Sequence, residues 1–192
     1  MWILGLDLGQ SADYTAAAVV ERRGEGPEAR YAVRHLERWL GVSYPEQVRR
    51  VGTLLQAPEL VEAQLVLDRT GVGRPVFDLF AEAGFAPVGV TLHGGDTVTH
   101  DGNQWSVPKR DVVFAAVAVL QQRRLDIARA LPEAATLVRE LETFRMRVDP
   151  ATAHDAYAAW RERDHDDVLL AVALAIWAAE AGVGGRAHVW WL

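Results

Sequence analysis

Apolar and polar positions along the chain follow two different periods, which predict a domain that mixes strands with helices. Residues 2–9 are apolar on both faces, as is typical of a central, covered strand. The segments 14–21 and 30–40 follow after polar turns. The segment 30–40 also fits a helix, but its partial alternation favours a strand. We therefore expect three antiparallel strands at the start of the domain.

The rest of the chain alternates between helical and strand patterns. Helices are predicted over 44–60, 74–84, 107–124, 132–144 and 165–182, and strands over 63–68 and 86–92. Ser106 is the expected cap of the third helix, after a polar loop over 94–106, and a hairpin is expected over 144–160. This order predicts an α/β domain of three layers: a mixed central sheet, antiparallel strands first and parallel strands afterwards, with helices on both faces.

Composition restricts the class of protein further. The chain has 192 residues, of which 50% are hydrophobic and 24% charged, as in an ordinary globular domain with one core. No repeat or linker divides residues 1–192, so we expect a single domain. The net charge of −6 provides no global basic field, and we expect weak binding of the isolated domain to DNA. The absence of cysteine excludes disulfides, cysteine nucleophiles and thiolate zinc sites, and no apolar run is long enough for a membrane span.

Four aspartates lie on elements that this architecture is expected to bring together. Asp7 interrupts an apolar strand, where a charge is costly unless something compensates it. Asp68 ends the strand of residues 63–68, and Asp166 and Asp167 open the last helix. In a sheet of this order, the strands of Asp7 and Asp68 are neighbours and the last helix packs on the same side. We therefore expect the four carboxylates to converge.

Converging carboxylates repel one another, and hard divalent cations such as Mg²⁺ or Mn²⁺ relieve that repulsion. Two such ions about 4 Å apart can activate a water molecule and stabilise the leaving oxygen in phosphodiester cleavage. Simpler explanations exist for single residues. Asp68 and Asp13 suit turns, whereas Asp166 and Asp167 suit the start of any helix. The complete set, more than any one member, favours a metal site.

Four blocks of sequence resemble the nuclease domain of bacteriophage terminase large subunits, which has the RNase H-like fold. They are GLDLGQSADYTAAAVVE (5–21), LVLDRTGVGRPVFDLF (65–80), WSVPKRDVV (105–113) and HDDVLLAVALAIWAA (165–179). The resemblance covers essentially the whole chain. It implies an endonuclease that cleaves double-stranded DNA with little sequence preference and uses two Mg²⁺ or Mn²⁺ ions.

The resemblance also implies a role for each acid. Asp7 would touch or bridge both ions, Asp68 would be the acid of the second strand, and Asp167 would be the ligand at the helix start. Asp166 would be a supporting or alternative ligand, and Asp13 an auxiliary acid.

Terminase relatives imply partners as well: a terminase ATPase domain, the portal and the small terminase, in the cytoplasm of a bacterial host. The chain carries no GxxxxGK[ST] phosphate loop. We therefore expect either an excised nuclease domain or a separate nuclease polypeptide, with no ATPase domain.

Basic residues near the acids are candidates for contacts to DNA phosphates, although each also fits a solvated surface position. They are Arg69, Arg74, Lys109, Arg110, Arg145, Arg147, Arg161 and Arg163. The last four lie on the expected hairpin, and Lys109 and Arg110 lie at a helix start, where anions bind well. Contacts of this kind predict salt-sensitive binding.

Other functions stay open at this point. A Holliday-junction resolvase or a ribonuclease H uses similar acids on the same fold. The opening LDLGQSADYTA also resembles the first phosphate loop of actin-like ATPases and sugar kinases, but those proteins need a second such domain and a second phosphate loop. An inactive DNA-binding remnant is a fourth alternative, and the intact set of acids argues against it.

Overall fold

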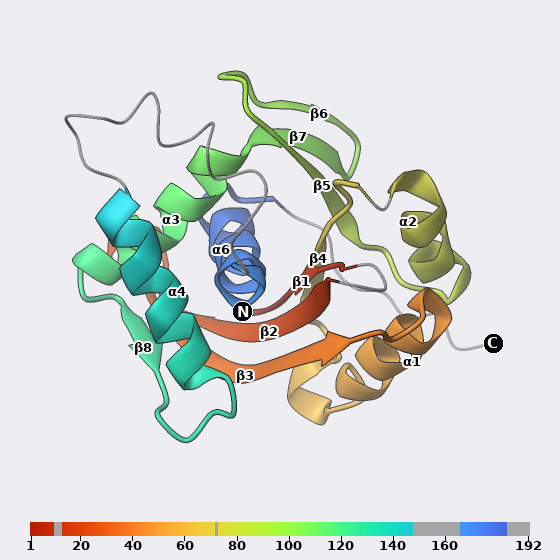
Figure 1. The fold of residues 1–192 in the computed structure, drawn as a ribbon, viewed down its shortest axis with the longest axis horizontal. Helices are drawn as coiled ribbons and strands as arrows, with labels where there is room; N and C mark the ends of the chain where they lie inside the picture. The colour runs from red at the N-terminus through yellow and green to blue at the C-terminus, as the bar shows by residue number, and fades with distance from the viewer. Residues whose placement is uncertain (10–12, 72, 148–165, 184–192) are drawn as a thin grey trace.

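A computed structural model describes residues 1–9, 13–71, 73–147 and 166–183, and an eight-stranded sheet forms its centre (Figure 1). The strands are β1 (Trp2–Asp7), β2 (Tyr14–Arg23), β3 (Arg30–Leu40), β4 (Gln64–Asp68), β5 (Val88–His93), β6 (Thr99–Asp101), β7 (Gln104–Pro108) and β8 (Leu125–Ile127). The α-helices are α1 (Tyr44–Leu54), α2 (Gly73–Glu82), α3 (Lys109–Gln121), α4 (Ala134–Arg147) and α6 (Asp167–Glu180). Two short 3₁₀ helices cover Gly26–Glu28 and Pro58–Leu60.

The sheet order is β6-β7-β5-β4-β1-β2-β3-β8. β1, β2 and β3 form an antiparallel meander, whereas β4 pairs with β1 in parallel and β5 continues in parallel beyond it. The predicted mixed sheet is therefore confirmed, and so is the prediction that the first strand and the first strand after the α1 crossover are neighbours. No helix in the described ranges is both long and apolar enough to cross a bilayer.

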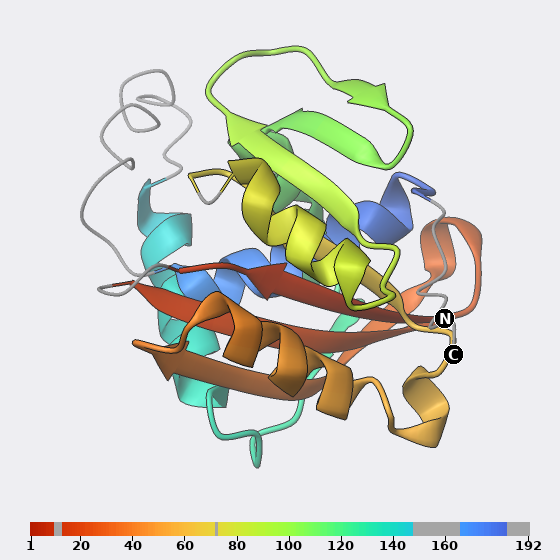
Figure 2. The same cartoon turned by 90° about the vertical axis from the view of Figure 1, so that its right-hand side faces the viewer.

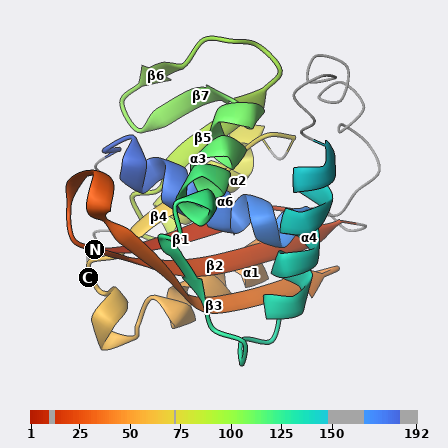
Figure 3. The same cartoon turned by 90° about the vertical axis from the view of Figure 1, so that its left-hand side faces the viewer.

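Alternating side chains divide the core into two layers. Ile3 and Val66 face α3, α4 and α6, whereas Leu4 and Leu65 face α1 and α2. This alternation is the period of two that strands impose on their side chains. Figure 2 shows α1 and α2 on one face of the sheet, and Figure 3 shows α3, α4 and α6 on the other.

α6 is buried along almost its whole length, from Val168 to Ala179. It packs against β1 and β2, where small residues let the backbones approach. A Cβ atom added at Gly5 would overlap the carbonyl oxygen of Ala171 and lie 3.1 Å from the amide nitrogen of Ala175. The position of α6 relative to β1 is thus set by direct backbone contact, which leaves little freedom to the residues at the start of the helix.

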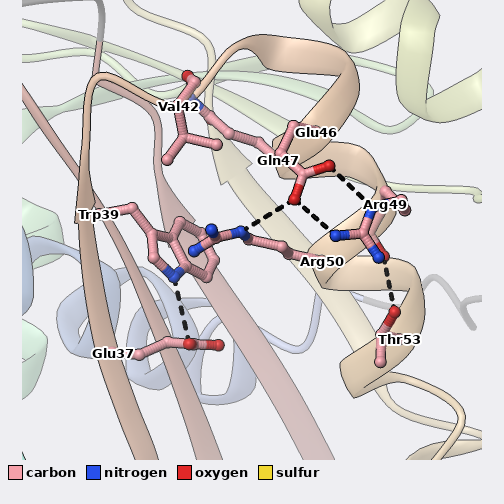
Figure 4. Close-up of polar contacts among 8 residues, drawn as sticks. All are labelled: Glu37, Trp39, Val42, Glu46, Gln47, Arg49, Arg50 and Thr53. Atoms are coloured by element: carbon pink, nitrogen blue, oxygen red, sulfur yellow. Dashed lines mark hydrogen bonds and ion pairs between the residues drawn. The ribbon is translucent and has the colours of Figure 1, made fainter.

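On the opposite face, α1 is held against the end of β3 by the polar contacts in Figure 4. Glu46 accepts hydrogen bonds from Arg49 and from Arg50 Nε, the latter at 3.3 Å. The guanidinium group of Arg50 lies 5.5 Å from the centre of the Trp39 ring. Gln47, which is buried, donates a hydrogen bond of 2.8 Å to the carbonyl of Val42. These contacts serve the fold and lie away from α6.

The polar loop predicted over 94–106 contains a β-hairpin, so that part of the prediction is wrong. Gly102, with a φ of 57°, lies in the two-residue turn between β6 and β7, and β7 pairs in parallel with β5. Ser106 lies inside β7 and does not cap α3, whose N-cap is Pro108. Short strands on a polar sheet edge lack the apolar alternation that would reveal them.

Other boundaries differ from the prediction as well. The helix predicted over 44–60 ends at Leu54, and Pro58–Leu60 forms a separate 3₁₀ helix. α3 ends at Gln121 because Arg123 takes a φ of 57°, which the helix cannot accommodate, and the three-residue strand β8 follows it. α4 continues to Arg147, so no hairpin starts at residue 144. The rest of the expected hairpin, 148–160, lies outside the described residues.

Candidate active site at the carboxyl ends of β1 and β4

Asp7 and Asp68 end two neighbouring parallel strands. Leu6 of β1 pairs with Leu67 of β4, and the next residue of each strand is an aspartate. Leu6 and Leu67 belong to the core beneath α1 and α2. Because successive side chains alternate across a strand, Asp7 and Asp68 both point to the other face, which α6 covers.

The start of α6 brings two more carboxylates to this edge. Asp166 is the N-cap residue and Asp167 is the first residue of the helix. Lys109, the first residue of α3, lies with its Nζ atom 3.1 Å from Asp166 Oδ2. The starts of α3 and α6, two helices of one face, therefore meet at the carboxyl ends of β1 and β4.

Electrostatics show that the four acids act on one another. The pKa of Asp7 is raised well above its ordinary value, mainly by burial and then by the negative charge of Asp68. The carboxylates of Asp167 and Asp166 raise it further, whereas the ammonium group of Lys109 lowers it. The negative charges of the other predicted catalytic acids therefore all act on Asp7.

Asp68 is buried and hydrogen-bonded. It is 6% exposed, and its Oδ1 atom accepts a 2.7 Å hydrogen bond from the amide of Thr70. Burial raises the pKa of Asp68 to about 6, against the opposing effects of the Thr70 side chain, the Thr70 amide and Lys109. The turn after β4 therefore orients one oxygen of Asp68, while burial disfavours the ionised form of its carboxyl group.

The chemistry of the donor set can be stated from these contacts. All four acids offer oxygen atoms, which hard divalent cations prefer. Within the described residues, no three His, Asp or Glu side chains are arranged to hold one ion as they stand. Lys109 is the cation that lies beside Asp166 in this structure.

The remaining predicted site residues near the start of the domain are placed as follows. Asp13 is exposed immediately before β2, and residues 10–12 beside it lie outside the description. Arg69 follows Asp68 but donates from Nη1 to Gln104 Oε1 on β7. Its guanidinium group lies 5.8 Å from the centre of the Phe77 ring. Arg69 is thus bound to β7 and α2, beside Asp68.

The other predicted DNA contacts are placed as follows. Arg110 forms ion pairs with Asp96 and, at 3.5 Å, with Asp111. Arg74 lies in α2, and Arg145 and Arg147 lie in the last turns of α4, so the latter two are helical and not part of a hairpin. Arg161 and Arg163 fall outside the described residues. Contact of these arginines with DNA stays a prediction.

One residue near the acids was not found from the sequence. Glu140 on α4 is 9% exposed, and its Oε2 atom accepts a 2.7 Å hydrogen bond from the amide of Leu169 in the first turn of α6. The pKa of Glu140 is raised to about 7, mainly by burial and also by the charges of Asp167 and Asp166, against the opposing effect of the Leu169 hydrogen bond. A glutamate on the same helical stripe as the buried Leu137 and Leu141 is a signal that could have revealed it.

The arrangement of a β1–β2–β3 meander, parallel strands beyond β1 and acids at the strand ends defines a domain of the RNase H-like class. A family model described as the terminase RNase H-like domain matches residues 4–179. The chain belongs to this family and is a terminase nuclease domain.

Solved structures agree with this fold. The large terminase nuclease from thermophilic phage G20c, with bound magnesium, is 18% identical over 92% of this chain and 80% of that one, with a TM-score of 0.58. The same nuclease with bound cobalt is 17% identical over 92% and 80%, with a TM-score of 0.54. A comparison with curated proteins found no match.

Proposed function

We propose that the chain is a metal-dependent endonuclease that cleaves double-stranded DNA with little sequence preference, as the nuclease part of a phage DNA-packaging terminase. The single observation that supports this proposal best is the shared influence on Asp7. Carboxylates from β4 and from the start of α6 all raise its pKa. Nothing in the packing of the sheet requires acids at these positions, and burying them together is costly.

The four carboxylates fit a hard divalent cation by donor chemistry, and the G20c nuclease has been solved with magnesium and with cobalt. We infer that Asp7, Asp68, Asp166 and Asp167 hold Mg²⁺ or Mn²⁺, with two ions in the active form and Asp13 as an auxiliary acid. Bound ions of this kind would activate a water molecule and offset the charge that develops on the scissile phosphate.

The residues of the chain itself have separable tasks in this proposal. Asp68, oriented by Thr70, would present a fixed oxygen. Lys109 would lower the cost of the crowded carboxylates before the ions bind, because it lies against Asp166 and lowers the pKa of Asp7. Lys109 is also close enough to the acids to meet a phosphate group of DNA there, with Arg69 beside Asp68.

Membership of the terminase family supports a proposal for the context of the domain. We propose that residues 1–192 act as one nuclease domain beside a terminase ATPase domain, the portal and the small terminase, in the cytoplasm of a bacterial host. The remaining DNA contacts would come from Arg74, Arg110, Arg145, Arg147, Arg161 and Arg163.

A plasmid-cleavage assay tests the proposal. Supercoiled plasmid is incubated with the protein and Mg²⁺ or Mn²⁺, and with the variants Asp7→Asn and Asp68→Asn. We expect nicking and linearisation by the wild type, loss of both in the two variants and in excess EDTA, and full activity in Asp126→Asn. Asp126 is a matched control because it is an exposed aspartate on β8, paired with Arg30 at 3.2 Å. Cleavage that persists in both site variants would refute the proposal.

The substrate class needs its own comparison, since related nucleases share this fold. Linear duplex, a four-way junction and an RNA–DNA hybrid are offered to the same protein at equal concentration. We expect the duplex to be cleaved at many positions. Strong preference for the junction or for the hybrid would favour a resolvase or a ribonuclease H instead.

A further inference from the structure

We propose that Glu140 is a positioning residue of the active site: it caps the first turn of α6 and thereby leaves the Asp166 carboxylate available to the acid cluster. This inference rests on the proposed function, in which Asp166 and Asp167 hold metal ions. It concerns a residue on a helix that contributes none of the four aspartates.

The first turn of a helix exposes amide groups that need acceptors, and an aspartate at the N-cap usually supplies one. Asp166 occupies the N-cap position of α6, but its side chain makes no capping hydrogen bond. The amide of Leu169, the third residue of the helix, donates instead to Glu140 Oε2 at 2.7 Å. A residue from another helix therefore performs the task that the sequence assigns to Asp166.

The burial of Glu140 indicates that its contact with Leu169 is part of the packing between α4 and α6. Glu140 is 9% exposed and lies on the apolar stripe of α4, near Leu137 and Leu141. A carboxylate at such a place is unfavourable unless it is strongly hydrogen-bonded. The hydrogen bond to the N-terminus of α6, with the helix dipole behind it, offsets part of that cost.

The consequence for the active site is geometric. Because the Leu169 amide is occupied, the Asp166 carboxylate turns away from its own helix and lies with Oδ2 3.1 Å from Lys109 Nζ. Without Glu140, the nearest acceptor for that amide is Asp166 itself, in the common N-cap conformation. Asp166 would then leave the acid cluster, and the first turn that carries Asp167 would lose its anchor to α4.

Two conservative variants separate positioning from a role of charge. Glu140→Gln keeps the length of the side chain and an oxygen acceptor but removes the charge. Glu140→Asp keeps the charge but withdraws the carboxylate by one methylene group from Leu169. If Glu140 acts by position, the glutamine variant resembles the wild type and the aspartate variant does not. If it acts as a further ligand or as a charge, the order is reversed.

The readouts are Mn²⁺ affinity by isothermal titration calorimetry and metal-free crystal structures of both variants. We expect Mn²⁺ affinity within about threefold of the wild type for Glu140→Gln and a loss of about tenfold or more for Glu140→Asp, in the range typical of residues that orient metal ligands. In the metal-free Glu140→Asp crystal, we expect the Asp166 carboxylate on the Leu169 amide and away from Lys109.

Glu180→Ala is the matched control, because Glu180 accepts a 2.7 Å hydrogen bond from Tyr31 at the other end of the same helix. We expect it to lower thermal stability and to leave Mn²⁺ affinity unchanged. Equal loss of affinity in Glu140→Gln and Glu140→Asp, or no loss in either, would overturn the inference.

Failure of the proposed function gives a different result: wild type and Asp7→Asn would then bind Mn²⁺ equally or not at all. In that case the position of Asp166 in the metal-free Glu140→Asp crystal still decides the inference. An Asp166 carboxylate that stays on Lys109 refutes it.

Discussion

Lys109 and Asp166 join the start of α3 to the start of α6, with 3.1 Å between Nζ and Oδ2. Lys109 is the only lysine in the sequence, and its charge lowers the pKa values of both Asp7 and Asp68. The ammonium group thus offsets part of the negative charge that the acids concentrate at the ends of β1 and β4. A divalent cation bound there would take over much of the same electrostatic task.

Replacing Lys109 by methionine tests that relationship. The metal-free variant should be less stable than the wild type, by about 2 to 6 °C in melting temperature, because Asp166 loses the ammonium group beside it and Asp7 and Asp68 lose a charge that lowers their pKa values. Added Mg²⁺ should narrow the difference, since the ion replaces the missing positive charge. Differential scanning calorimetry in EDTA and in Mg²⁺ measures both values. An equal difference in the two conditions would show that Lys109 acts by packing alone.

Replacing Asp7 by asparagine should separate stability from metal binding. The variant removes a buried carboxylate that three other carboxylates repel. Its metal-free melting temperature should therefore rise by a few degrees, and its free energy of unfolding by about 1 to 2 kcal/mol. The stabilisation that Mg²⁺ confers on the wild type should disappear. Thermal melts over a series of Mg²⁺ concentrations provide the measurement. A variant that is less stable than the wild type in EDTA would contradict this account.

Gly5→Ala should disturb the active site from inside the core. The new methyl group would overlap the backbone of α6 at Ala171, and relief requires a shift of the helix that carries Asp167. We expect destabilisation of about 1 to 3 kcal/mol, measured by urea denaturation, together with weaker Mn²⁺ binding. Gly52→Ala is the control. Gly52 lies inside α1, and a Cβ atom added there would lie 3.4 Å from the Phe85 ring, at ordinary contact distance. That variant should be neutral or slightly stabilising, since alanine favours a helix over glycine.

Glu140 makes the stability of the metal-free protein depend on pH. Its pKa is raised to about 7, mainly by burial, so the folded state holds its proton to higher pH than the unfolded state does. The stability linked to this group is therefore present at pH 4 and is lost as the pH rises through about 7. Glu140→Gln does not titrate, so its melting temperature in EDTA should rise relative to the wild type between pH 5 and pH 8. A constant difference across that range would refute the assignment.

Much of the fold could be predicted from local pattern. The apolar run of residues 2–9 and the unbroken apolar sequence of α6 specify their elements without help from the rest of the chain, whereas the partial alternation over 30–40 only favours a strand. The short strands β6 and β8 could not be found in the same way, because three residues carry no period. They exist because β7 and β3 offer them unpaired backbone groups.

The candidate site divides in the same manner. Asp7 was conspicuous because a charge inside an apolar strand has no local explanation, and Asp68, Asp166 and Asp167 followed from the ends of their elements. Lys109 was predicted only as a phosphate contact, since its pairing with Asp166 joins residues far apart in the chain. Glu140 was missed because its partner, the amide of Leu169, lies on another helix.

The sequence alone therefore determined the strands β1 to β5, the main helices and the identity of the four acids, since these depend on side-chain type and spacing. The tertiary structure alone decided which groups meet: Lys109 with Asp166, Glu140 with Leu169, and Gly5 with Ala171. The physical reason is that hydrogen bonds, ion pairs and backbone contacts act over a few ångströms in space. Only the folded chain brings together residues that the sequence separates.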